Sequence, residues 1–102
     1  MKITVCQIDN IPKNFQQSFK NLSNYLSVNK TDLLLLPEMP FSQWLSKDKK
    51  PNVKKWKKAV KEHNNFVKNL SLLDAKYIIA TKPTIDNNGK CLNIAFLYNQ
   101  TN

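Results

Sequence analysis

The apolar positions along the first third of the chain follow strand and helix periodicities. Residues 2–8 alternate between apolar and polar side chains, which predicts a strand. Residues 33–36 are four consecutive leucines, which predicts a second strand buried on both faces. Between them, the apolar spacing predicts an amphipathic helix over residues 14–28, whose buried stripe is Phe15, Phe19, Leu22 and Leu26. Asn14 is expected to cap this helix, with Gln17 in a capping-box arrangement. Strand, helix and buried strand form a βαβ unit, so the two strands should be parallel.

The remainder of the chain predicts one more helix and two more strands. A long connection over 39–52 leads to a helix over 53–71, whose apolar stripe is Trp56, Ala59, Val60, His63, Phe66, Val67 and Leu70. A third strand begins at 77–80 and runs to Thr84, and Asn88-Gly89 predicts a hairpin into a fourth strand over 92–98. The order β-α-β-α-β-β predicts an α/β layered fold with an antiparallel pair at its end.

Composition bounds the chain to one small domain of 102 residues with a formal charge of +9. Such a charge would suggest an acidic partner, but all 16 basic residues are lysine. Arginine is favoured for phosphate and base-edge contacts, so its absence argues against a nucleic-acid partner. The densest lysine run, over 47–61, is better explained as a solvated helix face, because Trp56 falls on the apolar stripe and not among the lysines.

The two cysteines and the single histidine indicate no metal or disulfide. Cys6 and Cys91 are far apart in strand-like segments, and without a secretory signal they are expected to be reduced thiols in a cytoplasmic protein. No segment is long enough to cross a bilayer, so we expect no membrane partner. His63 lies on an apolar helix stripe without a cluster of other ligands, which favours a hydrogen-bonded core residue over a metal ligand.

Glu38 is the strongest candidate for a catalytic residue. Pro37 cannot donate to a strand ladder, so Glu38 should be delivered at the carboxyl end of a buried strand, where α/β sheets form ligand crevices. Apolar surroundings there would raise its pKa and suit a general base, although a solvated carboxylate is the ordinary alternative. Phe41 and Trp44 follow closely and could line a substrate pocket, or equally act as lid or subunit-contact residues.

Taken in order, several segments make the chain similar to the carbon–nitrogen hydrolases, the nitrilase/amidase superfamily. They are the opening strand ending at Gln7, the segment 33–39, and the runs PEMPFSQWL (37–45), KKWKKAVKEH (54–63) and GKCLNIAFLYN (89–99). The resemblance implies a four-layer α-β-β-α sandwich and a Glu–Lys–Cys triad with Glu38 as the general base. It implies a small amide, N-carbamoyl or nitrile substrate, no metal or organic cofactor, a homo-oligomer when complete, and a structural hydrogen-bonding role for Asn93.

The departures from this family indicate that one triad member is present. The chain ends at Asn102, just short of the expected lysine, and the expected cysteine lies further on. Cys6, Cys91 and Lys82 do not match the positions of the nucleophile and the catalytic lysine. We therefore expect residues 1–102 to be the N-terminal portion of such a hydrolase domain, inactive alone. The alternatives are a stand-alone, catalytically inactive interaction module and, less favoured, a small basic nucleic-acid-binding domain.

Overall fold

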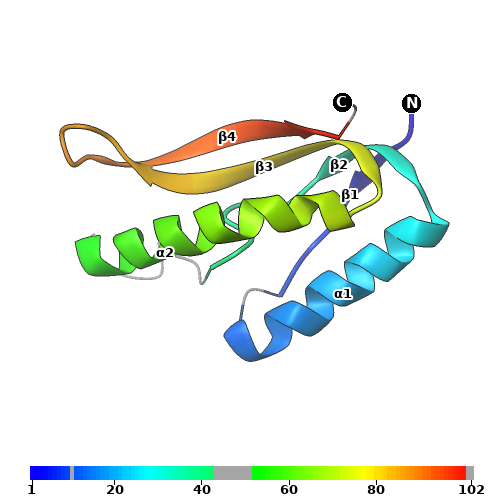
Figure 1. The fold of residues 1–102 in the computed structure, drawn as a ribbon, viewed down its shortest axis with the longest axis horizontal. Coiled ribbons are helices and arrows are strands. Elements are labelled where there is room, and N and C mark those ends of the chain that lie inside the picture. Colours follow the sequence, from blue (N-terminus) through cyan, green and yellow to red (C-terminus); the bar gives the residue numbers. More distant parts are fainter. Residues whose placement is uncertain (10, 43–51, 101–102) are drawn as a thin grey trace.

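The computed structural model describes residues 1–9, 11–42 and 52–100, which form a mixed α/β fold (Figure 1). In chain order the elements are β1 (Ile3–Val5), α1 (Pro12–Val28), β2 (Thr31–Leu35), α2 (Val53–Phe66), the 3₁₀ helix η2 (Val67–Leu72), β3 (Ala75–Ile85) and β4 (Cys91–Asn99). This order confirms the predicted succession of strands and helices.

The four strands form one sheet in the order β1-β2-β3-β4. β1, β2 and β3 are parallel, which confirms the predicted βαβ unit, and β4 returns antiparallel to β3. The β3–β4 hairpin turns at Asp86–Lys90, where the Asp86 carboxylate accepts the amide protons of Asn88 and Lys90. Gly89 adopts a φ of +80°, a value that glycine tolerates without steric cost, so the Asn88-Gly89 prediction is confirmed.

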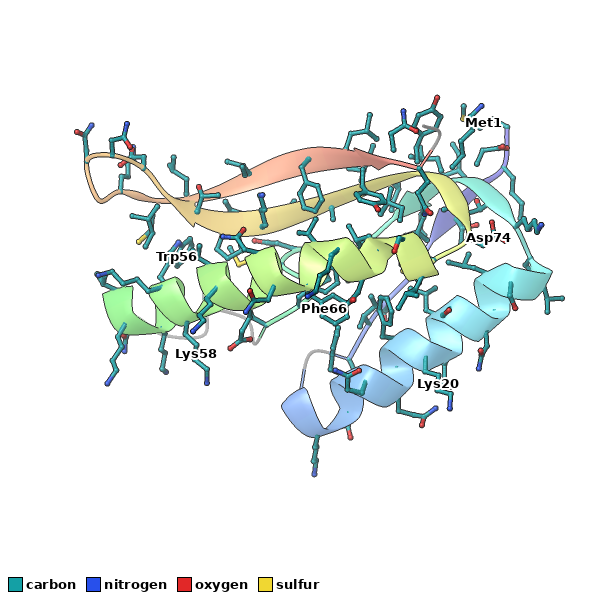
Figure 2. The ribbon with its side chains drawn as sticks, viewed as in Figure 1. Met1, Lys20, Trp56, Lys58, Phe66 and Asp74 are labelled. Carbon is teal, nitrogen blue, oxygen red and sulfur yellow. The ribbon has the colours of Figure 1, made fainter. Side chains whose placement is uncertain are left out.

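Both long helices lie on the same side of the sheet (Figure 1). The core forms between them and the sheet, and its fully buried side chains include Leu26, Leu34, Leu70, Leu73 and Ile78. The predicted stripe of α1 is confirmed, with Phe15, Phe19 and Leu26 buried and Leu22 half-buried. Near the first turn of α2, the Trp56 Nε1–H donates to the Thr84 carbonyl oxygen at 2.9 Å, which fastens the helix to β3 (Figure 2).

The prediction that the leucines of β2 are buried on both faces is wrong. Leu34 is fully buried under the helices, whereas Leu33 and Leu35 are half-buried. Their side chains point to the other face of the sheet, which no described helix or strand covers (Figure 1). We call this surface the open face; its described strand residues are Ile3, Val5, Leu33, Leu35, Tyr77, Ile79, Thr81, Pro83, Ile85, Cys91, Asn93, Ala95, Leu97 and Asn99. Val5 and Leu97 are 73% and 60% exposed there.

The predicted capping of the first helix is also wrong. The helix begins at Pro12, and its N-cap residue, Ile11, makes no side-chain cap hydrogen bond. Proline is well suited to the first helical turn because its φ is already helical and its missing N–H would have had no partner. Asn14 instead donates its side-chain amide to the Asp9 carboxylate at 3.0 Å, and Gln17 donates to Asn21.

Several element boundaries differ from prediction. β1 is shorter than expected: it ends at Val5, the Cys6 N–H still bonds to the Leu35 carbonyl oxygen at 3.3 Å, and Ile8 enters the core beside the helices. β2 spans 31–35 instead of 33–36, and the second helix changes from α to 3₁₀ geometry after Phe66, as helix ends often do.

Candidate active site

The turn that follows β2 places Glu38 beside β3 and β4. The last ladder bond of this segment runs from the Leu36 N–H to the Ile79 carbonyl oxygen at 3.0 Å, just before Pro37. Met39 lies two residues after Pro37, and its N–H donates to the Thr81 Oγ1 at 2.9 Å. Backbone pairing with β3 therefore stops at Pro37, as predicted. Beyond that point the Thr81 hydroxyl, and not a backbone carbonyl of β3, accepts the hydrogen bond of the Met39 N–H.

Glu38 and Asn93, both selected from the sequence, are brought together by this turn. The Asn93 Nδ2–H donates to the Glu38 Oε1 at 3.1 Å across a separation of 55 residues. Asn93 lies on β4 opposite Pro83 of β3. The side chains of paired residues point to one face, so Asn93 shares a side of the sheet with Thr81 and not with the helices.

Pro83 is compatible with β3 because the neighbouring strand has already ended. β2 last pairs at Leu35, opposite Ile79, so the part of β3 that contains Pro83 has β4 as its one described strand neighbour. A proline without an N–H is tolerated where a strand is an edge strand. The turn 37–42 runs along the edge of β3 that β2 no longer occupies. There the Thr81 hydroxyl accepts the Met39 N–H. Thr81 was not selected from the sequence, although a hydroxyl following the apolar run 77–80 was a usable signal.

Met39 gives the turn a strained conformation. Its φ is +43°, in the left-handed region that non-glycine residues seldom adopt. The side chain is buried, with 4% of its surface exposed. Such a conformation costs on the order of 1–2 kcal/mol and persists where surrounding contacts fix it.

The surroundings of Glu38 differ from the prediction. The sequence predicts a carboxylate against apolar surface, whereas the structure leaves the Glu38 side chain exposed. It lies with Asn93 on the side of the sheet away from α1 and α2, so the helix layer does not cover it. Its assignment as a general base stays a prediction.

Lys82 and the two cysteines occupy other positions. Lys82 alternates with Thr81 and therefore lies on the helix side, where its Nζ is 5.4 Å from the centroid of the Phe96 ring. The Cys6 thiol lies 3.7 Å from the Leu35 carbonyl oxygen, and burial raises its pKa. Cys91 is half-buried at the start of β4, and both thiols are free. The structure thus places Lys82 on the opposite face of the sheet from Asn93, the partner of Glu38.

Phe41 lies in the core and not at the surface beside Glu38. Its ring centroid is 4.5 Å from that of Phe66 and 6.0 Å from that of Phe15. Only 7% of its surface is exposed, so in this chain the ring serves packing between the turn and both helices. Trp44, the other pocket candidate, lies outside the described residues.

His63 is a buried residue with both ring nitrogens paired, which confirms the expected core role. Its Nδ1 lies 2.8 Å from the Ala59 carbonyl oxygen, and its Nε2 accepts the Phe41 N–H at 3.3 Å. A carbonyl oxygen only accepts, so Nδ1 carries the proton and the ring is neutral. Burial lowers the pKa of His63 and outweighs the hydrogen bonding to the backbone of Ala59 and of Met39, which raises it; the positive charge of Lys82 also lowers it.

Clusters of potential metal ligands and helices able to cross a membrane are both absent from the described residues. No group of three or more potential metal ligands gathers anywhere in residues 1–9, 11–42 and 52–100. Within the same ranges, no helix combines the length and apolar character needed to cross a membrane. A surface hollow lined by Gln16, Gln17, Phe19, Lys20, Ser23 and Leu72 lies on α1 and η2, in the helix layer and not at Glu38.

Comparison with known proteins adds no relative. No family model matches the chain, and no curated protein or solved structure is significantly similar to it. The class that the fold defines is therefore a mixed α/β protein with a four-stranded sheet and helices on one side.

Proposed function

We propose that this chain is the N-terminal segment of a cysteine-dependent hydrolase of non-peptide carbon–nitrogen bonds, with Glu38 as its general base. The observation that carries the proposal is the placement of Glu38 beyond the carboxyl end of a parallel strand, with Asn93 holding its Oε1 across the sheet. Ligand sites in α/β sheets form at that end of the strands. The Thr81 contact to Met39 fixes the backbone next to Glu38, so the carboxylate has a defined position.

The chemistry assigned to Glu38 is proton transfer. A second carboxylate oxygen, Oε2, takes the proton of a cysteine thiol, and the thiolate attacks the carbonyl carbon of a small amide or N-carbamoyl compound. A lysine stabilises the oxyanion, the C–N bond breaks, and the leaving amine takes the proton back from Glu38. Water then hydrolyses the thioester: Glu38 accepts a proton from the attacking water and returns it to the departing cysteine sulfur, which restores the thiol and the carboxylate. The lysine and cysteine are assigned to residues that follow Asn102 in the complete enzyme, and a nitrile is the other substrate class.

The open face supports the proposed sandwich architecture. None of the fourteen described strand residues on this face is charged, although the chain contains 16 lysines. In a lysine-rich protein, exposed strand positions would be expected to include lysine, whereas Val5 and Leu97 remain mostly exposed. Stacked sheets pack about 10 Å apart through apolar faces of this kind, so a second sheet layer would bury these side chains.

The same face supports a second candidate, a catalytically inactive interaction module. A contiguous exposed apolar surface is a common feature of sites that bind another protein. This candidate needs no general base, whereas the hydrolase depends on one. The hydrolase and the interaction module can therefore be distinguished by replacing the Glu38 carboxylate, which should abolish hydrolysis but leave binding to a partner unchanged.

The test uses the chain extended by its natural downstream reading frame, assayed for ammonia or amine release from small amides and N-carbamoyl compounds. Glu38→Gln keeps the Asn93 contact possible but removes the base, and should lower kcat by about 10²–10⁴-fold. Glu62→Gln is the matched control, because Glu62 lies on α2 and pairs with Lys58 at 4.0 Å. Full activity in Glu38→Gln, or a natural reading frame that ends at Asn102, would refute the hydrolase and favour the interaction module.

A further inference from the structure

The turn that carries Glu38 is held at three points by three different elements. Asn93 of β4 binds the Glu38 carboxylate, and Thr81 of β3 accepts the Met39 N–H. The third point lies on the helix side, where the Nε2 of His63 on α2 accepts the Phe41 N–H. The turn thus bridges the sheet and α2 over a few residues.

The strained residue of the turn lies between two of these points. Met39, with its φ of +43°, is flanked by the Glu38 contact and the Phe41 contact and makes the Thr81 contact itself. A left-handed conformation at a non-glycine residue relaxes when the contacts that impose it are removed. Loss of one point should therefore change the conformation of the whole turn, including the position of Glu38.

The helix-side point depends on the protonation state of His63. The Nδ1 proton is directed at the Ala59 carbonyl oxygen at 2.8 Å, so Nε2 can accept only while the ring is neutral. A second proton would sit on Nε2 and face the Phe41 N–H, so the acceptor would be lost and two donors would oppose each other. The observed contact between Nε2 and the Phe41 N–H therefore requires the neutral ring.

The groups around His63 act on the charge of its ring in opposite directions. Burial, the largest effect, disfavours the positive ring, whereas hydrogen bonding to the backbone of Ala59 and of Met39 favours it. Lys82 of β3 is the charged group that acts on it, and it is repulsive. The turn contributes the Phe41 ring, 5.4 Å away, while its carboxylate, Glu38, is engaged by Asn93 on β4. On α2 itself, the neighbouring Glu62 is paired with Lys58. Burial outweighs the two backbone contacts and the pKa is lowered on balance, so protonation acts against the packed arrangement.

We propose that His63 is a positioning residue for Glu38, and that protonation of its ring releases the 37–42 turn while the rest of the fold persists. The functional consequence rests on the proposed role of Glu38 as the base: in the complete hydrolase, activity would decline on the acid side as the carboxylate loses its position. The structural step, release of the turn, stands independently of any catalysis.

The experiment follows backbone amides of the ¹⁵N-labelled 102-residue chain by NMR from pH 7.5 downward until the His63 ring resonances have titrated. The hydrogen-exchange protection factors of Met39 and Phe41 should fall about tenfold as the ring titrates, the effect of losing one hydrogen bond. The side-chain amide of Asn93 should shift with the same midpoint. The amide of Ile78, in the core strand β3, should stay protected.

Two variants separate positioning from general stability. His63→Gln retains a side-chain acceptor that does not titrate, so the turn should keep its protection at every pH. Leu70→Ala removes a fully buried core side chain that makes no hydrogen bond to the turn, so it should lower overall stability and leave the pH dependence of Phe41 intact. The proposal is overturned if Phe41 stays protected while His63 titrates, if its protection falls only together with that of Ile78, or if His63→Gln shows the wild-type pH dependence. Because these readouts involve no turnover, an inactive complete protein would refute the proposed function without affecting this result.

Discussion

Two adjacent isoleucines of β3 provide a matched test of the one-sided core. Ile78 is fully buried under the helices, whereas Ile79 points to the open face and is 38% exposed. Both are the same residue type in the same strand, so β propensity cancels when Ile78→Ala and Ile79→Ala are compared. The difference between the two variants in the free energy of unfolding therefore measures how completely each face of the sheet is covered.

The expected magnitudes follow from the buried surface. Isoleucine to alanine removes three carbon groups, worth about 0.8 kcal/mol each when buried, or about 2.4 kcal/mol. At Ile78 a cavity adds to this loss, which gives about 3–4 kcal/mol in the free energy of unfolding. At Ile79 about three fifths of the transfer term applies and no closed cavity forms, which gives about 1.5 kcal/mol. The expected difference is about 2 kcal/mol.

The losses in the free energy of unfolding would be measured by urea unfolding, monitored by circular dichroism and extrapolated linearly to zero urea. Each variant would be measured at two protein concentrations tenfold apart. Ile78→Ala should lower the midpoint more than twice as far as Ile79→Ala, with unchanged slopes. Equal losses at the two positions would refute the one-sided core. If Ile79→Ala became more costly at the higher concentration, a second copy would be covering the open face in solution.

Two further predictions concern His63 and the hairpin. The folded pKa of His63 is lowered from 6.5, so its contribution to stability is complete above about pH 6.5 and is lost as the pH falls below that value toward the folded pKa. Denaturant titrations between pH 7.5 and pH 5 should show this decline, and His63→Gln should flatten it; a wild-type slope that persists in the variant would assign the decline to other groups. Gly89→Ala should cost about 1 kcal/mol, because its φ of +80° disfavours a side chain while nothing lies within 4 Å of the added Cβ. Thermal unfolding would detect this loss, and an unchanged melting temperature would show that the hairpin turn has relaxed.

The features that could be predicted from the sequence are those set by neighbours along the chain. The helical spacing of Phe15, Phe19 and Leu26 defines one face at a period of 3.6 residues whatever that face packs against. The positive φ at Gly89 depends on the residue itself. The end of β2 pairing at Pro37 follows from a missing N–H, so these local elements were found correctly.

The cap of the first helix shows where local reasoning fails even at short range. Asn14 has the right side chain for a cap, but Asp9 lies close enough to bind its amide at 3.0 Å. Pro12 meanwhile fixes the helix start two residues earlier. The competing partner was visible in the sequence, although its position was not, because that depends on how the chain leaves β1.

The candidate site was predicted as separate residues, and its geometry was decided by the sheet. Glu38 and Asn93 were both selected from the sequence, but their contact depends on the β3–β4 register, which places Asn93 opposite Pro83. Thr81 was missed because its role depends on the turn running along the edge of β3 that β2 no longer occupies. Phe41 was expected near a pocket and lies in the core, since α1 and α2 both approach the turn.

By itself, the sequence determined the periodicity of the strands and helices, the hairpin and the delivery of Glu38 after a strand, because each depends on spacing and on the chemistry of nearby residues. Only the tertiary structure decided which sheet face is covered. It also decided that Met39 takes a left-handed conformation and that Asn93, Thr81 and His63 converge on one turn. Such contacts join residues up to 55 positions apart, and they form only when the strand register and the helix layer are both in place.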